Sequence, residues 1–385
     1  MQACAMRPAV CGTGSPFAMT RIIFLIGGAI GLLAGLWGGL ARLGLVTATP
    51  DASVVLLQHG GLMVSGFLGT LISLERAVAL GKWPAFLAPA SCGTGTLLLV
   101  TGFSTSIGLA LIALASLVFV GASTWIAIKQ PAAFTLLLLL GALAWLVANL
   151  LWLWGLPIAE FVPLWMLFLL LTILGERLEL SRLLRNRPAS MLAFWCFTLF
   201  AISGTIIRIT RPDLLTPVGV FTLGAGFLGL AAWLVFFDVA RRTVRQSGRV
   251  GFIAAALLGG YAWLGAAGLL IVVFALPGAG PAYDAILHSF FVGFVFAMIF
   301  GHAPIVFPAV LGNEIRFTRL LYMPLALLHG TLIVRLAGDL FDAPALRQWG
   351  AAGNALCIAL FLALFAGSAI LTKRRSSGGG GEEHA

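Results

Sequence analysis

Four histidines fall inside long apolar stretches of this 385-residue chain, and they are the residues best suited to chemistry there. They are His59, His288, His302 and His329, of which His288 and His302 share one stretch. A polar side chain inside hydrocarbon is costly, so an intramembrane histidine marks a functional site by default. Neutral imidazole is also a common ligand of metals and of haem iron, which makes cofactor binding the first hypothesis to consider.

The composition requires these histidines to be positioned by membrane helices. Hydrophobic residues make up 61% of the chain, charged residues only 9%, and the mean hydropathy is +1.07. Because a bilayer provides no hydrogen-bond partners for the backbone, an all-α bundle is expected. The five cysteines are scattered, with no CxxC or CxxCH pattern. The pattern gives no support for a disulfide scaffold, a thiolate metal cluster or covalent attachment of a c-type haem.

Apolar runs of bilayer-spanning length, roughly 17–25 residues or more, follow one another along the chain. The connections are short, and no polar stretch is long enough to form a soluble domain. We therefore expect one transmembrane bundle over residues 21–372, with a short cytoplasmic tail at 1–20 and a flexible one at 373–385. The twelve expected spans are 21–46, 52–80, 84–103, 107–128, 132–155, 159–180, 190–208, 216–239, 250–276, 281–311, 316–338 and 347–372.

The positive charges are distributed unequally between the two ends of the bundle. Eighteen of the 23 Lys and Arg residues lie in the tails or near the loops that follow even-numbered spans. This excess predicts that both termini are cytoplasmic. It also accounts for the net charge of +10, so no nucleic acid is expected as a partner. We call this end of the bundle the inner end and the opposite end the outer end. The outer end has five basic residues: Arg42, Arg208, Arg211, Arg335 and Arg347.

His59 and His288 are expected to form a pair at one depth. Spans 2 and 10 run in the same direction, and each histidine lies about two turns from the outer end of its span. Two imidazoles on facing helices are the ligands of a bis-histidine b-type haem. Gly60 and Gly66 leave room for a flat ring, and Met63 follows His59 on the same helical face. The pattern predicts one low-spin haem b; the alternative is that both rings only hydrogen-bond to other helices.

The outer arginines are candidates for binding the haem carboxylates. Arg208, Arg211 and Arg335 lie where the propionates of such a haem would project, as does Arg42. Arginine is the natural partner of a carboxylate at low dielectric. The alternative is that these arginines simply mark the edge of the membrane.

His302 and His329 form a looser pair toward the inner end. Together they could hold a second haem or a copper ion, with His302 about four turns below His288. Pro304 and Pro308 follow His302 at once and predict a kinked helix end. The alternative is therefore that His302 satisfies a carbonyl that a proline has freed.

Acidic–basic dipeptides recur at the inner ends of spans 2 and 6. They are Glu75–Arg76 and Glu176–Arg177. We expect them to anchor the membrane boundary and to form ion pairs between helices; the alternative is that they take up protons.

Three tryptophans are expected in the interfacial belt: Trp152, Trp154 and Trp165.

With these residues in hand, the chain resembles the catalytic subunit of haem–copper oxidases and the NnrS-like proteins related to it. The spacing of His59 and Met63 matches the H-x-x-x-M context of the low-spin haem ligand in span 2 of that family. The resemblance implies a cytochrome c oxidase subunit I-like bundle in a bacterial inner membrane. Span 10 matches the phenylalanine- and glycine-rich run of the family through His288, Gly293, Phe296, Gly301, Pro308 and Gly312.

The chain also departs from that family. Span 10 of an oxidase carries two histidines one residue apart, and Ile286 occupies the first of these positions here. Spans 6 and 7 have no histidine, so the ligands of an oxygen-reducing binuclear centre are missing. A terminal oxidase and a nitric oxide reductase are therefore not expected. The resemblance to NnrS-like proteins, which bind haem and copper and are linked to nitrosative stress, is the nearer one.

Three functions remain open at this point. The first is a haem b protein that acts in electron transfer, redox sensing or nitric-oxide defence, with a quinol or a cytochrome as redox partner. The second is a haem-free secondary transporter in which histidine, glutamate and arginine residues relay protons. The third is an assembly factor that handles haem or copper transiently.

Overall fold

The computed structural model describes residues 16–47, 53–181, 187–210, 217–311 and 316–378. Over these residues the chain forms helices and no strand. Twelve helical stretches are long and apolar enough to cross a membrane, which confirms the predicted number. Their boundaries lie within a few residues of the predicted ones, from Arg21–Arg42 to Pro344–Ala369. The protein is a multi-pass helical membrane protein.

Several spans consist of more than one helical segment. In chain order the helices are α1 (Pro16–Arg42), α2 (Ser53–Gly61), η2 (Leu62–Gly69), α3 (Thr70–Leu80), η3 (Trp83–Phe86), α4 (Leu87–Thr101), α5 (Thr105–Lys129), α6 (Ala133–Leu153), α7 (Ile158–Ser181), α8 (Pro188–Thr210), α9 (Pro217–Phe237), α10 (Ala240–Thr243), α11 (Arg249–Phe274), α12 (Pro281–His288), η5 (Ser289–Phe296), α13 (Ala297–Leu311), η6 (Arg319–Leu321), α14 (Tyr322–Leu340) and α15 (Pro344–Gly378). Span 2 comprises α2, η2 and α3, span 6 is α7, and span 10 comprises α12, η5 and α13.

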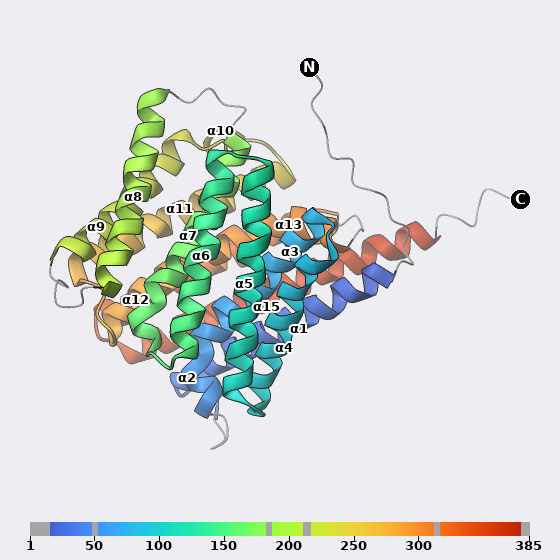
Figure 1. The fold of residues 1–385 in the computed structure, drawn as a ribbon, viewed down its shortest axis with the longest axis horizontal. Helices are drawn as coiled ribbons and strands as arrows, with labels where there is room; N and C mark the ends of the chain where they lie inside the picture. The colour runs from blue at the N-terminus through green and yellow to red at the C-terminus, as the bar shows by residue number, and fades with distance from the viewer. Residues whose placement is uncertain (1–15, 48–52, 182–186, 211–216, 312–315, 379–385) are drawn as a thin grey trace, which may run out of the picture.

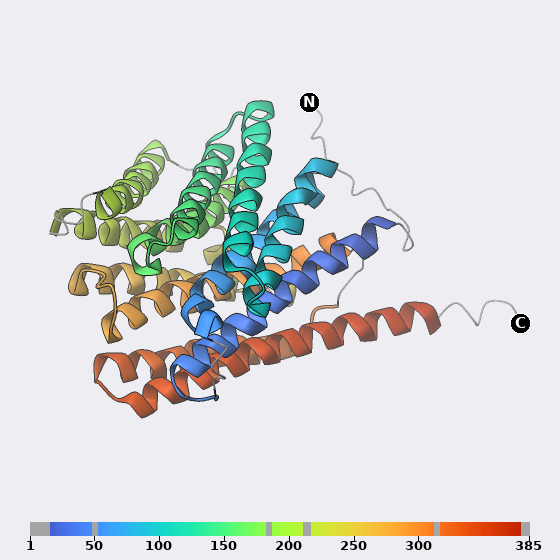
Figure 2. The same ribbon diagram turned by 60° about the horizontal axis from the view of Figure 1, so that its bottom comes forward.

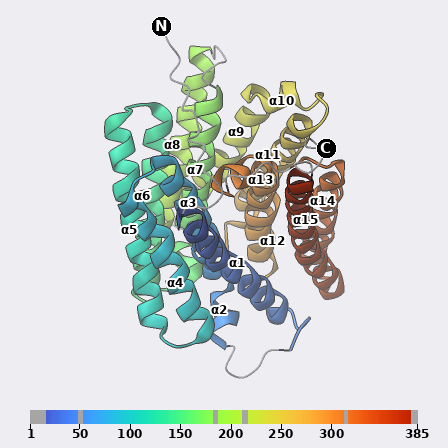
Figure 3. The same cartoon turned by 90° about the vertical axis from the view of Figure 1, so that its right-hand side faces the viewer.

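Consecutive spans pack as antiparallel neighbours because their connections are short. The closest pairs include α4 with α5, α6 with α7, α8 with α9 and α14 with α15 (Figure 1). Figure 2 shows α15 running along one side of the bundle beside α1, with the start of α1 and the end of α15 at the same end. In Figure 3, α1 crosses in front of spans 2 and 10. The share of buried residues is highest in span 6, at 83%, and next in span 10, at 67%.

Two π-helical segments interrupt the spans that carry His59 and His288. Segment η2 begins three residues after His59, and η5 begins directly after His288. Phe67 of η2 stacks against Phe296 of η5, with ring centroids 6.2 Å apart. π-helical turns are rare and occur frequently at functional sites. The two histidine-bearing spans therefore share one local irregularity and contact each other there.

The structure corrects several predicted details. Trp152 and Trp165 are buried inside the bundle rather than placed in an interfacial belt, whereas Trp154 is exposed. Helix α13 continues through Pro304 and Pro308 and ends at Leu311, so the helix end lies within the predicted run, although neither proline terminates the helix. The C-terminal helix continues to Gly378 and so includes part of the segment expected as a flexible tail. Lys, Arg and Ser tolerate a helix.

Candidate functional site

His59 and His288 line the same cavity, which we call the outer cavity. Its volume is about 640 Å³, and its walls come from α1, α5, α6, α7, α14, α15 and spans 2 and 10. Arg42, Tyr283 and Arg335 also line it. The two histidines of the predicted pair therefore share one cavity.

The ring of His288 is fixed by a chain of polar contacts. Its Nδ1 donates to the carbonyl oxygen of Asp284 at 2.8 Å and lies 3.3 Å from the carboxylate. That carboxylate accepts two hydrogen bonds from Arg335, from Nε at 2.9 Å and from Nη2 at 3.0 Å. Since a carbonyl can only accept, Nδ1 carries the hydrogen and Nε2 of the neutral ring keeps its lone pair. This is the arrangement by which proteins orient a metal-binding histidine.

His59 packs against glycines of α1. A Cβ at Gly38 would lie 3.2 Å from the Cβ of His59, and one at Gly39 would lie 3.7 Å from its Cδ2. Within the described part of the chain, Nδ1 of His59 is buried and has no hydrogen-bond partner. A buried nitrogen without a partner is costly. The ring is thus not held by the structural hydrogen bond that the alternative interpretation requires.

The glycines and the methionine near His59 divide between two environments. Gly60 and Met63 line the outer cavity, as expected. Gly66 does not: it packs against α1 and α4, and a Cβ there would lie 3.0 Å from Oγ1 of Thr96. The expectation that Gly66 leaves room beside His59 is therefore wrong, because η2 changes the helical period from Leu62 onward.

The predicted arginines also have different roles. Arg335 lines the outer cavity, but its guanidinium is already paired with Asp284. Arg208 does not line the cavity, and its Nε is buried without a partner among the described residues. Arg211 lies outside the described residues. Arg42 also lines the outer cavity. In the described part of the chain, no carboxylate lies within ion-pair distance of its guanidinium.

Sequence reasoning missed Asp284 and Gln58. Asp284 precedes His288 by four residues, and this spacing on a helix is the signal that could have revealed the contact. Gln58 accepts a hydrogen bond from Nε1 of Trp152 at 2.8 Å, which holds that ring against the cavity wall. A contact between residues 94 positions apart has no local signal in the sequence.

A second, smaller cavity lies between spans 2, 6 and 10, and we call it the inner cavity. Its volume is about 80 Å³, and Glu75, Glu176 and His302 each reach it from a different span. His302 Nδ1 donates to the carbonyl of Met298 at 2.7 Å, not to a carbonyl freed by proline. Its Nε2 is buried, has no hydrogen-bond partner in the described structure, and lies 3.9 Å from Oε2 of Glu176. The two glutamates thus face a shared cavity.

Neither the outer nor the inner cavity brings His302 and His329 together among the described residues. His329 Nδ1 accepts a hydrogen bond from Nε1 of Trp263 at 2.9 Å, and the ring lines neither the outer nor the inner cavity. Among the described residues, no group of three or more His, Cys, Asp or Glu side chains is placed to hold a metal ion. A haem needs only two axial ligands, and His59 and His288 are the two histidines that the structure places around one large cavity.

Residues 21–370 match the family described as a domain of unknown function (DUF8744). The match covers most of the chain, and the protein belongs to this family. No curated protein and no solved structure matches it.

Proposed function

We propose that this protein is a membrane b-type haem protein in which His59 and His288 bind one haem in the outer cavity. The observation that carries the proposal is that both rings line one cavity of about 640 Å³. This volume lies within the range of roughly 300–1,000 Å³ typical of small-molecule sites. The bundle would share the layout of the oxidase-like proteins that the sequence resembles.

The residues present fit such a group. His288 offers an Nε2 lone pair because its Nδ1 hydrogen is committed to Asp284. No described residue forms a hydrogen bond with Nδ1 of His59, so no such bond competes with a ligand for this nitrogen. Gly60 leaves open space, since a Cβ at this position would meet no atom within 4 Å. Arg42 supplies a positive charge for the acidic edge of the macrocycle.

His59 and His288 would hold the haem, which would supply a one-electron couple. The protein's own residues orient the rings: Asp284 and Arg335 hold His288, and the glycines of α1 allow that helix to pack against His59. The function that follows is electron transfer, redox sensing or a response to nitric oxide, with a quinol or a cytochrome as redox partner. It would take place in a bacterial inner membrane with both chain termini cytoplasmic.

The absorption spectrum of the purified protein, oxidised and then reduced, tests the proposal. The reduced protein should show the sharp bands of a low-spin b-type haem. His59→Ala and His288→Ala should each abolish that spectrum, because each removes one axial ligand. His329→Ala is the matched control, since it also removes a membrane histidine and should leave the spectrum unchanged.

A haem-free, proton-coupled transporter is the second candidate, and the inner cavity favours it. Glu75, Glu176 and His302 are three titratable side chains from three spans around one small cavity. Such groups within a membrane typically belong to proton pathways. A folded protein without haem absorbance would reject the haem proposal. Proton flux in reconstituted vesicles that is lost in Glu176→Gln would then support the transporter.

A further inference from the structure

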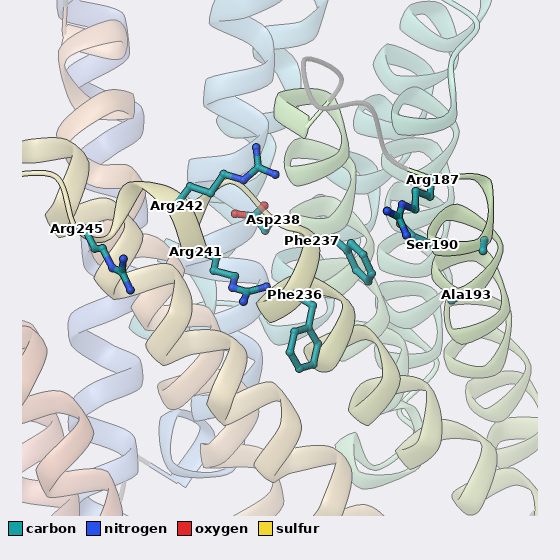
Figure 4. A pocket seen from close by; sticks show the side chains of 10 residues that line it. Arg187, Ser190, Ala193, Phe236, Phe237, Asp238, Arg241, Arg242 and Arg245 are labelled. Atoms are coloured by element: carbon teal, nitrogen blue, oxygen red, sulfur yellow. The ribbon is translucent and has the colours of Figure 1, made fainter.

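A hollow at the inner end of the bundle combines several groups that bind anions. It lies between the start of α8 and α10 and has a volume of about 1,030 Å³. Figure 4 shows Arg187 and Ser190 on one side, with Arg241, Arg242 and Arg245 on the other and Asp238 between them. The positive charges therefore come from both walls of the hollow.

These positive charges are not neutralised within the described structure. Asp238 is the one carboxylate among the described residues that line the hollow, and it is already satisfied. It pairs with Arg177, from Nε at 3.0 Å and Nη2 at 3.4 Å, and accepts the backbone N–H of Ala240 at 2.7 Å. No described carboxylate lies within ion-pair distance of the four arginines that line the hollow: Arg187, Arg241, Arg242 and Arg245.

Ser190 provides an independent observation. Only 7% of this residue is exposed, and its Oγ is buried without a hydrogen-bond partner among the described residues, although the residue lines the hollow. Trp233 fixes its backbone by donating from Nε1 to the carbonyl of Ser190 at 2.7 Å. Ser190 is the third residue of α8, and the N-terminal end of a long helix favours negative charge.

We propose that this hollow binds the phosphate group of an anionic ligand. Arginines bind phosphate through charge-assisted hydrogen bonds, and a hydroxyl beside a helix N-terminus adds a further donor. The excess of positive charge at the inner end accounts for arginines along the membrane boundary. It does not account for a buried, unpartnered hydroxyl on a serine that lines the same hollow. The phosphate belongs either to a phospholipid headgroup or to a soluble anion.

Phe236 connects the hollow to the lipid-facing surface. The ring is 61% exposed, and the guanidinium carbon of Arg241 lies 5.9 Å from its centroid. A phospholipid could place its phosphate among the arginines and its acyl chains along this surface, since basic sites between membrane helices bind anionic headgroups. A soluble phosphate would use the arginines and Ser190 alone.

Binding measurements with two probes test the site in the full-length protein. One arm titrates inorganic phosphate into detergent-solubilised protein by calorimetry. The other measures by native mass spectrometry how much phosphatidylglycerol is retained, with phosphatidylcholine as the neutral reference. Binding in either arm, weakened about tenfold or more by the double variant Arg241→Gln/Arg242→Gln, is the expected result. Ser190→Ala should weaken the same binding to a smaller extent.

The matched control is Arg249→Gln/Arg319→Gln. It removes two exposed arginines from the same end of the bundle but outside the hollow. This control should bind within about twofold of wild type if local geometry, rather than total charge, determines affinity. Retention of phosphatidylglycerol alone would identify a lipid site, and binding of inorganic phosphate would identify recognition of the phosphate group itself. No selective binding in either arm, or equal losses in both double variants, would overturn the proposal.

Discussion

His288 and His302 lie on the same span and use the same hydrogen bond, yet they face different surroundings. In each ring Nδ1 donates to the carbonyl four residues earlier, at 2.8 Å for His288 and 2.7 Å for His302. Nε2 is left with a lone pair in both neutral rings. His288 lines a cavity of about 640 Å³ together with His59, whereas His302 lines one of about 80 Å³ together with two glutamates.

The comparison indicates that the surroundings of Nε2, rather than the histidine itself, determine what each ring does. The outer cavity is the larger, and it brings a second imidazole, that of His59, to the one on His288. The inner cavity has space only for a few water-sized groups, and it holds acceptors that a proton or a water molecule can satisfy. Substitutions that affect one cavity and not the other therefore test the comparison.

The largest expected effect comes from filling the outer cavity. Gly60→Phe places a ring where a Cβ meets no atom within 4 Å, so the helix tolerates the change while the cavity loses volume. Bound haem should fall below roughly a tenth of wild type, because a cofactor site must enclose most of its ligand. The pyridine haemochrome assay on purified protein measures this content.

Gly121→Phe is the control for that experiment. Gly121 is also a helical glycine whose Cβ would meet no atom within 4 Å, but it is exposed on α5 and borders neither cavity. Its haem content should equal that of wild type. Equal haem in the Gly60 and Gly121 variants would contradict the placement of the cofactor in the outer cavity.

A smaller effect is expected from the carboxylate that supports His288. Asp284→Asn keeps the backbone carbonyl that accepts from Nδ1 but removes the charge that Arg335 holds in place. Loss of such a supporting group typically weakens a metal site about 10–100-fold. The rate of haem transfer to apomyoglobin should rise accordingly.

Asp238→Asn breaks a buried arginine–carboxylate pair at the inner end, Arg177–Asp238, and serves as the comparison. It should lower stability and leave the haem-transfer rate unchanged. A similar acceleration in both variants would mean that Asp284 acts only through general stability.

The smallest effect is expected in the inner cavity. Glu176→Gln replaces an acceptor with an amide that can donate toward the lone pair on Nε2 of His302, now 3.9 Å from Oε2. One new buried hydrogen bond contributes about 0.5–1.5 kcal/mol, so the free energy of unfolding should stay equal or rise slightly. Denaturant unfolding in micelles measures the difference, with exposed Glu160→Gln on the same helix as control. A clear loss of stability would show that Nε2 needs the carboxylate.

Much of the fold could be predicted from the sequence, because the bilayer fixes the length and polarity of each span. The same reasoning placed His59 and His288 at one depth, since both spans run in the same direction. It could not predict η2 and η5, because these π-helical segments depend on packing between distant spans. The role of Arg335 was missed for a similar reason: its pairing with Asp284 joins residues 51 positions apart. His329 was expected beside His302, but Trp263 holds it elsewhere.

The number of haem groups per chain in wild type, His288→Ala and His302→Ala tests the central claim most directly. The account predicts one haem in wild type, none in His288→Ala and one in His302→Ala, because only the outer cavity holds the cofactor. The measurement requires the haem and protein concentrations of the same purified, folded sample. Two haem groups in wild type with one lost in His302→Ala, or no haem in folded wild type, would contradict it.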